Sequence, residues 1–224
     1  MMSKTTPNLT DLRQSVADFY EKRGADFART RLGHWSGFNL IKPFLQSGKL
    51  VVDVGAGNGR LAAYLPEDVP YLGIEPSLSY RETALHETLL IPGGLPELPI
   101  HDEISYTTCC FAVFQHIPPE DLERCRDELM RITAPGGYLI VTSWLPSFED
   151  MVPVDGRTGS ERWIPWKAGE EIDMRYVHCP TLETWNQLWT MGGHEIIQSG
   201  YIEEQGWTEI KEHARNLCVI LKKN

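Results

Sequence analysis

The chain has 224 residues, of which 42% are hydrophobic and 10% aromatic, enough to build one domain around a sizeable core. Its net charge of −10 argues against a broad surface that binds polyanions unaided. The five cysteines form no C-x-x-C pair and no apolar run has membrane-spanning length, so we expect a cytoplasmic protein without disulfides, metal cluster or membrane segment.

The first 47 residues are predicted to form a helical cap. Apolar residues at helical spacing predict a helix that breaks near Gly24, and a second helix is predicted from Ser36 through Phe44. Residues 1–60 carry nine basic and five acidic side chains and form the only basic stretch of the chain. A solvated helix face explains this imbalance at least as often as a binding surface does.

A glycine-rich turn follows the first predicted strand. Asp53 lies in that strand, and Gly55, Gly57 and Gly59 permit positive φ and let a ligand approach the backbone closely. A helix is then predicted from about Asn58 to residue 65. A turn of this kind is by itself a weak indication of ligand binding, because tight turns also use glycine for structural reasons.

The second predicted strand strengthens this interpretation. It covers residues 71–74, so Glu75 would stand at the carboxyl edge of the sheet, where its carboxylate can accept hydrogen bonds from both hydroxyls of a ribose. Arg60 stands where a dinucleotide fingerprint has its third glycine, which makes a nicotinamide enzyme less favoured. The pair of features therefore predicts a nucleoside cofactor.

The remaining elements alternate between helix and strand. They are expected as a helix over 77–86, a turn-rich link over 92–96, a strand over 104–112, a helix from Pro118, a strand over 138–144, a helix over 181–191 and strands over 195–202 and 216–221. Such alternation specifies a parallel sheet covered on both faces. Residues 145–173 interrupt it and are predicted to form an inserted loop or lid near the carboxyl edge.

Several motifs resemble those of class I S-adenosylmethionine-dependent methyltransferases. They are Asp53-Val54-Gly55-Ala56-Gly57-Asn58-Gly59, Glu75 and Pro135-Gly136-Gly137-Tyr138-Leu139-Ile140-Val141. The resemblance implies an α/β, doubly wound, mostly parallel seven-stranded sheet with helices on both faces and an antiparallel last strand, built as one Rossmann-like domain over residues 1–224. It also implies S-adenosyl-L-methionine as the cofactor. The candidate cofactor-binding residues are Asp53, Gly55, Ala56, Gly57, Gly59, Glu75, Pro76, Phe111 and Trp35.

A closer resemblance covers most of the chain. Residues 19–35, the element Arg175-Tyr176-Val177-His178 and residues 217–223 are similar to segments of the tRNA wobble-uridine carboxymethyl methyltransferases. That family esterifies a carboxymethyl group on the wobble uridine of tRNA, and its eukaryotic members work with a small zinc-binding partner subunit. The likeness implies tRNA and possible help from such a subunit as partners of this chain.

The chain departs from related sequences at two places. Gly94 stands ahead of Leu98-Pro99 where an acidic residue usually binds the adenine amino group, so backbone groups or Asp102 are expected to recognise adenine. The family's paired histidines appear here as Gln115-His116, which leaves one histidine.

Methyl transfer to a carboxylate needs alignment and an oriented anion more than a strong base, and arginine suits that task. Arg31 and Arg29 are the candidate anion clamp, with a surface salt bridge as the competing interpretation. Tyr20 and Trp35 could close over the cofactor and acceptor, or could be core residues.

Three further candidates for binding or catalysis each have a structural alternative. His116 is a candidate polar ligand or weak base, although a lone histidine is more often structural. Arg175 and His178 are candidate acceptor-binding residues, or a solvent-facing pair at a sheet edge. The aromatic and basic segment 162–167 could grip single-stranded nucleic acid, but a lid packed on the core is favoured.

The predicted function is therefore an S-adenosylmethionine-dependent methyltransferase acting on a tRNA carboxylate. The alternatives are a small-molecule O- or N-methyltransferase and a cofactor-binding subunit without catalysis, and a nicotinamide oxidoreductase ranks last.

Overall fold

The structure is a computed structural model that describes residues 9–85, 88–146, 151–157, 159–168, 170–191, 194–204, 206–209 and 214–224. Its main sheet has eight strands in the order β10-β9-β11-β5-β4-β1-β2-β3. The strands are β1 (Val51–Val54), β2 (Tyr71–Ile74), β3 (Leu90–Ile91), β4 (Ser105–Cys110), β5 (Thr133–Trp144), β9 (Glu195–Glu203), β10 (Gly206–Thr208) and β11 (Asn216–Lys222).

The sheet has the predicted direction pattern. Strands β3, β2, β1, β4 and β5 pair in parallel, whereas β11 runs antiparallel to both β5 and β9. This confirms the mostly parallel sheet and the antiparallel last strand. The resemblance implied seven strands, and the sheet has eight in the described residues: β3 and β10 lie outside the six strands that the sequence located, and β10 adds to the free edge of β9.

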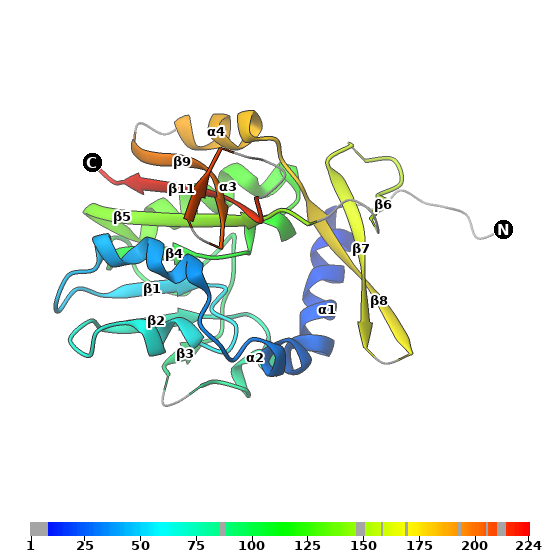
Figure 1. The fold of residues 1–224 in the computed structure, drawn as a ribbon, viewed down its shortest axis with the longest axis horizontal. Helices are drawn as coiled ribbons and strands as arrows, with labels where there is room; N and C mark the ends of the chain where they lie inside the picture. The colour runs from blue at the N-terminus through cyan, green and yellow to red at the C-terminus, as the bar shows by residue number, and fades with distance from the viewer. Residues whose placement is uncertain are drawn as a thin grey trace.

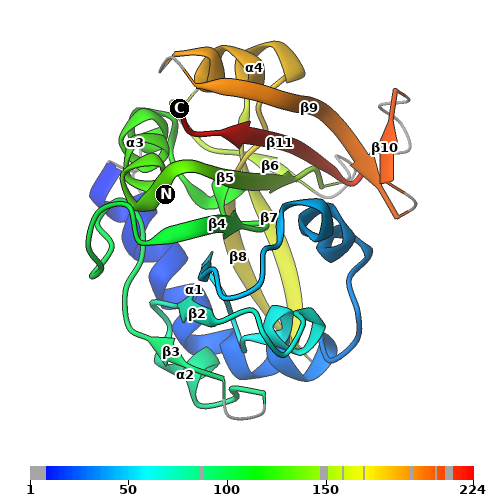
Figure 2. The ribbon, with the colours of Figure 1, turned by 90° about the vertical axis from the view of Figure 1, so that its left-hand side faces the viewer.

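Helices cover both faces of the sheet (Figures 1 and 2). Apolar side chains of α3 (Leu122–Ile132) and α4 (Leu182–Thr190) pack in the larger core cluster with the buried faces of β1, β5 and β11. The 3-10 helices η1 (Ser36–Phe44) and η2 (Arg60–Tyr64) pack in a second cluster that includes the opposite faces of β1, β4 and β5. The remaining short helices are α2 (Leu78–Arg81), η3 (Phe114–His116) and η4 (Pro119–Asp121).

Helix α1 (Leu9–Thr30) is longer than predicted, because it continues through Gly24. A Cβ atom at Gly24 would lie 3.0 Å from the backbone nitrogen of Tyr80, so this glycine permits close packing of α1 on α2 instead of ending the helix. In Figure 1 α1 stands across the ends of the strands, between the main sheet and the pair β7–β8. It thus caps the carboxyl edge of the parallel strands, where open α/β sheets bind ligands.

The segment predicted as an inserted loop or lid contains regular structure. Strands β6 (Val152–Pro153), β7 (Glu161–Ala168) and β8 (Glu171–His178) form a separate antiparallel sheet in the order β6-β7-β8. Trp166 of this sheet stacks on Phe27 of α1, with ring centroids 5.1 Å apart. The small sheet and α1 therefore pack together as a cap on the carboxyl edge.

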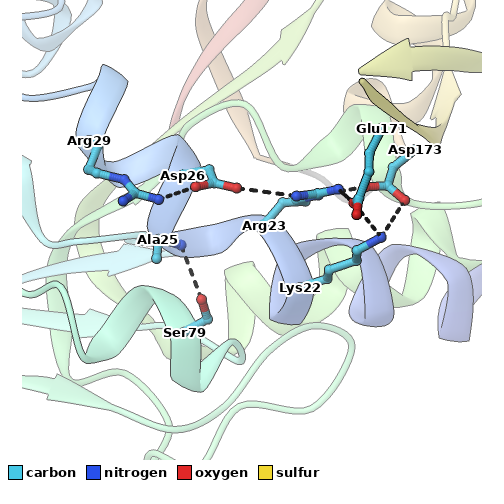
Figure 3. Close-up of polar contacts among 8 residues, drawn as sticks. All are labelled: Lys22, Arg23, Ala25, Asp26, Arg29, Ser79, Glu171 and Asp173. Atoms are coloured by element: carbon cyan, nitrogen blue, oxygen red, sulfur yellow. Dashed lines mark hydrogen bonds and ion pairs between the residues drawn. The ribbon is translucent and has the colours of Figure 1, made fainter. Parts of the chain in front are cut away.

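Ion pairs join the same two elements at their outer end. Arg23 and Lys22 of α1 bind Asp173 and Glu171 of β8, and the Arg23 Nε to Asp173 Oδ2 distance is 2.5 Å (Figure 3).

Within the described part of the chain, no helix combines the length and the apolar composition that crossing a membrane requires.

Candidate functional site

The predicted glycine turn follows β1 at the carboxyl edge of the sheet. Gly55, Gly57 and Gly59 have φ values of 75°, 59° and 74°, in the left-handed region that favours glycine. A Cβ atom at Gly55 would lie 2.3 Å from Cγ2 of Val113, so the space beside the turn is closed to any larger residue. The turn therefore exposes backbone in a conformation that other residues rarely adopt.

Glu75 fixes the shape of this turn. The backbone N–H groups of Gly57 and Ser77 each donate to one carboxylate oxygen of Glu75, both at 2.9 Å. The side chain is buried, and burial raises the pKa of Glu75. Each oxygen keeps a further lone pair, so the carboxylate remains able to accept ribose hydroxyls at the predicted place.

Asp53 lies behind the turn in β1. Tyr71 donates a hydrogen bond to its Oδ2 atom at 2.9 Å, and burial raises the pKa of Asp53 to about 7. The buried amide nitrogen Nδ2 of the neighbouring Asn58 has no hydrogen-bond partner among the described residues. An unpaired buried donor beside a glycine cradle fits a polar ligand such as the nucleoside end of S-adenosylmethionine.

The other predicted cofactor residues lie around the same edge. Trp35 and Phe111 are half-buried and pack edge to face, with ring centroids 5.3 Å apart. Ala56 is buried in the turn, while Pro76 is exposed directly after Glu75 and lies beside Gly94. The structure thus brings the sequence-predicted cofactor set together, and its role in binding stays a prediction.

A second group of polar side chains lies where the cap meets the sheet edge. The hydroxyl of Tyr20 on α1 is 2.7 Å from Nε2 of His116, and Nδ1 of His116 is 2.9 Å from the carbonyl oxygen of Tyr176. Because a carbonyl oxygen only accepts, Nδ1 carries the proton and Nε2 accepts the hydrogen bond from Tyr20. Burial and the charge of Arg175 lower the pKa of His116 to about 3, so the imidazole is neutral at physiological pH.

Arg175 completes this group. Its Nη1 atom donates to the hydroxyl of Tyr20 at 3.3 Å, and its guanidinium lies 5.1 to 5.5 Å from the ring centroids of Phe19, Phe27 and Trp144. Only 7% of the residue is exposed, and Nε has no hydrogen-bond partner in the described chain. A buried cation held by aromatic faces, with no acidic partner among the described residues, is suited to bind an anion.

The two N-terminal arginine candidates lie in different surroundings. Arg31 is exposed at the end of α1 with its guanidinium 4.1 Å from the centroid of Phe27, one of the rings around Arg175. Arg29 is exposed and pairs with Asp26, as Figure 3 shows, so the competing interpretation of a surface salt bridge describes its contacts. The structure brings Arg31 to the group around Arg175 and leaves Arg29 outside it.

His178 is also separated from Arg175. It is opposite Glu161 in the β7–β8 register, and burial lowers its pKa to about 4. Arg175 and His178 are both buried, so the alternative of a solvent-facing pair at a sheet edge is wrong. Residues three apart on a strand point to opposite faces, which explains why His178 lies with Glu161 while Arg175 lies with Tyr20.

Sequence reasoning missed three side chains of this region. Tyr80 of α2 packs beside Gly57 and Tyr20, Trp144 ends β5 over Arg175, and Arg60 follows the glycine turn. Trp144 was predicted only as the last residue of a buried strand, and its place at a carboxyl edge was the available indication. No residue pattern pointed to Tyr80.

Comparisons with known proteins identify the domain and the fold of this chain. Residues 52–141 match the family model described as a methyltransferase domain. A tRNA (carboxymethyluridine(34)-5-O)-methyltransferase of Arabidopsis thaliana is 25% identical over 158 residues, which cover 66% of this chain and 36% of the relative. A dTDP-4-amino-2,3,4,6-tetradeoxy-D-glucose N,N-dimethyltransferase of Saccharopolyspora spinosa is 25% identical over 144 residues, covering 62% of this chain and 55% of the relative. The aligned regions thus span about a third and about half of these curated relatives.

Solved structures share the fold at low identity. A Haloferax volcanii protein in complex with the Trm112 methyltransferase activator has a TM-score of 0.65 and 15% identity, with 92% of this chain and 96% of that chain covered. The 1,6-didemethyltoxoflavin-N1-methyltransferase of Burkholderia thailandensis has a TM-score of 0.68 and 12% identity, with 100% and 93% covered.

Proposed function

The chain carries a methyltransferase domain with the class I S-adenosylmethionine-dependent fold, and from this premise we propose that it methylates a carboxylate, with the carboxymethyl group of a tRNA wobble uridine as the acceptor. The predictions of this fold, of a methyltransferase domain and of S-adenosylmethionine as its cofactor are confirmed by the family match and the solved structures. The identity of the acceptor is the new element of the proposal.

The observation that carries the proposal is the buried guanidinium of Arg175. An uncompensated buried charge is costly, and an acceptor carboxylate would supply the missing negative charge. Arg31 adds a second cation beside the same aromatic ring, Phe27. Two guanidinium groups in one place favour an anionic acceptor over an amine or a neutral hydroxyl.

The hydrogen-bond directions support the same class of acceptor. The Tyr20 hydroxyl donates to Nε2 of His116, so this nitrogen has no free lone pair with which to remove a proton. With its pKa lowered to about 3, His116 is also a weak base. A carboxylate is already ionised at neutral pH and needs no general base, whereas an alcohol or ammonium acceptor has to lose a proton.

The transfer is a single displacement. When bound, S-adenosylmethionine supplies a methyl group already activated by the positive sulfur, the carboxylate oxygen forms the new bond to carbon, and the electron pair of the carbon–sulfur bond stays on sulfur. Arg175 and Arg31 would orient the carboxylate, while Tyr20 and His116 hold Arg175 in place. The cap of α1 and the small sheet would exclude water from the reaction.

Two findings support tRNA as the carrier of the carboxylate. The Arabidopsis thaliana relative acts on carboxymethyluridine 34 of tRNA, and residues 19–35 resemble that family ahead of the cofactor motif. The net charge of −10 suggests that tRNA binding needs a helper, and the Haloferax volcanii neighbour was solved with an activator subunit. A similar partner and a cytoplasmic location are part of the proposal.

A small-molecule methyltransferase is the second candidate. The Saccharopolyspora spinosa relative and the Burkholderia thailandensis neighbour both methylate nitrogen on small molecules. A third alternative, a cofactor-binding subunit without catalysis, predicts cofactor binding with no transfer to any acceptor.

The test is transfer of labelled methyl from S-adenosylmethionine to bulk tRNA and, separately, to a small-metabolite extract, each with and without an activator subunit. Alkali-labile label on tRNA is expected, because a methyl ester hydrolyses under mild base. Arg175→Gln should abolish this label, whereas Arg29→Gln, which removes one guanidinium from the exposed Asp26 pair, should leave it within about twofold. Label confined to metabolites, or alkali-stable label on tRNA, would contradict the proposal.

A further inference from the structure

Arg60 is a cation directly after the glycine turn, and no task has been assigned to it. It follows Gly59, which caps the 3-10 helix η2 in the left-handed conformation. Its guanidinium lies 5.3 Å from the ring centroid of Phe38. Within the described residues it makes no hydrogen bond and no ion pair, so its charge is compensated only at a distance.

The electrostatic surroundings of Arg60 add to this picture. Burial and the nearby charge of Arg31 both lower the pKa of Arg60, which shows that the two guanidinium groups repel each other. Asp53 is the acidic group that acts on Arg60, but burial raises the pKa of this carboxyl to about 7 and weakens its compensation at neutral pH. An anion bound next to Arg60 would relieve the repulsion.

The sheet order indicates which anion that is. Strands β2, β1 and β4 are neighbours, so a ligand whose ribose lies at Glu75, after β2, extends across the turn after β1 toward the end of β4. Phe38 contacts both Arg60 and Phe111, the residue that follows β4. Arg60 is therefore on the side of the turn away from the ribose, where the amino-acid part of S-adenosylmethionine would lie.

We propose that Arg60 binds the α-carboxylate of the methionine part of the cofactor, while Arg175 and Arg31 serve the acceptor carboxylate. This assignment rests on the cofactor and on the proposed function. Two separate anion sites would keep the carboxylate of the cofactor apart from that of the acceptor, each with its own guanidinium. The α-carboxylate is the only anionic group that S-adenosylmethionine carries, so the contact is a specific one.

The test compares two ligands by titration calorimetry on the full chain. S-Adenosylhomocysteine has the carboxylate, whereas decarboxylated S-adenosylhomocysteine keeps the adenosine, the sulfur and the amino group. Arg60→Gln should weaken S-adenosylhomocysteine by about 10- to 100-fold, as expected for one charge-assisted contact, and leave the decarboxylated ligand within about twofold. The wild-type preference between the two ligands should shrink accordingly.

Arg31→Gln is the matched control, because it removes a guanidinium whose charge acts on Arg60. An equal and selective loss with Arg31→Gln would assign the effect to the general electrostatic field of the site and overturn a contact by Arg60. Equal weakening of both ligands by Arg60→Gln would instead indicate damage to the glycine turn, and no weakening would show that the carboxylate binds elsewhere. Failure of wild-type protein to bind S-adenosylhomocysteine would remove the cofactor assignment itself.

Discussion

Replacement of Tyr20 by phenylalanine tests the hydrogen-bonded group that holds the acceptor side together. The ring would keep its packing against Phe19, whose centroid is 5.2 Å away, and only the hydroxyl would be lost. That loss leaves the buried Nε2 of His116 without a donor and removes the Tyr20 hydroxyl as an acceptor for Arg175. An unsatisfied buried acceptor costs about 1–3 kcal/mol, and the long 3.3 Å contact to Arg175 adds little.

The free energy of unfolding of Tyr20→Phe should therefore fall by about 2 kcal/mol in urea titrations at pH 7.5. For a chain of this size that corresponds to a melting temperature about 4–8 °C lower. Tyr64→Phe is the control, since the Tyr64 hydroxyl has no hydrogen bond within the described residues, and it should change stability by less than about 0.5 kcal/mol. If the two variants are equally stable, the hydrogen bond from Tyr20 to His116 has no net value for stability and the reasoning from an unsatisfied buried acceptor is refuted.

Three further predictions concern pH and the glycine turn. The pKa of Asp53 in the folded protein is about 7, above its ordinary 3.8, so its contribution to stability is fully present below pH 3.8 and is lost as pH rises toward 7. In denaturation series between pH 4 and 8, the free energy of unfolding of Asp53→Asn should therefore rise relative to wild type by up to about 4 kcal/mol. A difference that stays constant with pH would contradict this. Gly55→Ala should lower the free energy of unfolding by about 1–3 kcal/mol from its positive φ alone. It should also weaken S-adenosylhomocysteine binding in titration calorimetry, because the new Cβ atom would meet Val113. Near-normal stability would refute the steric argument. Since His116 is neutral above its pKa of about 3, the pH profile of kcat/KM for a carboxylate acceptor should have the same shape from pH 6 to 9 in wild type and in His116→Asn. A limb that is present in wild type and absent from His116→Asn would indicate that His116 is a general base, because the titration of Asp53 near pH 7 is common to both.

The strands and the glycine turn of the cofactor half could be predicted because their information is local, whereas the helix predicted over 77–86 is only the short α2 and the one predicted from about Asn58 to residue 65 is the 3-10 helix η2. The strand at 71–74 ends where the sequence indicates, and Gly55, Gly57 and Gly59 all adopt the positive φ that their spacing suggests. In both cases a few consecutive residues determine the backbone, and tertiary packing only completes it.

The cap could not be predicted in the same way because its structure depends on contacts between distant segments. Residues 145–173 contain prolines and glycines that suggested a loop, yet β7 and β8 pair over eight residues each and pack on α1. Arg175 and His178, just beyond that segment, were considered as one pair, whereas β8 buries them on opposite faces. The predicted helix break at Gly24 was wrong for a related reason, since this glycine permits a close contact with Tyr80, which is distant in sequence.

Most of the proposed acceptor side lies outside the segment that matches the methyltransferase domain. Tyr20 lies on α1, Arg31 directly after it and Arg175 on the small sheet, whereas residues 52–141 supply the glycine turn, Glu75 and, on the acceptor side, His116. The proposed roles thus divide the molecule into a cofactor-binding part and a cap that supplies most of the acceptor side. Within the cap, the stack of Trp166 on Phe27 and the ion pairs of Arg23 join the small sheet to α1. Under the proposed roles, a chimera that keeps residues 52–141 and carries a foreign cap should take the acceptor of the cap donor.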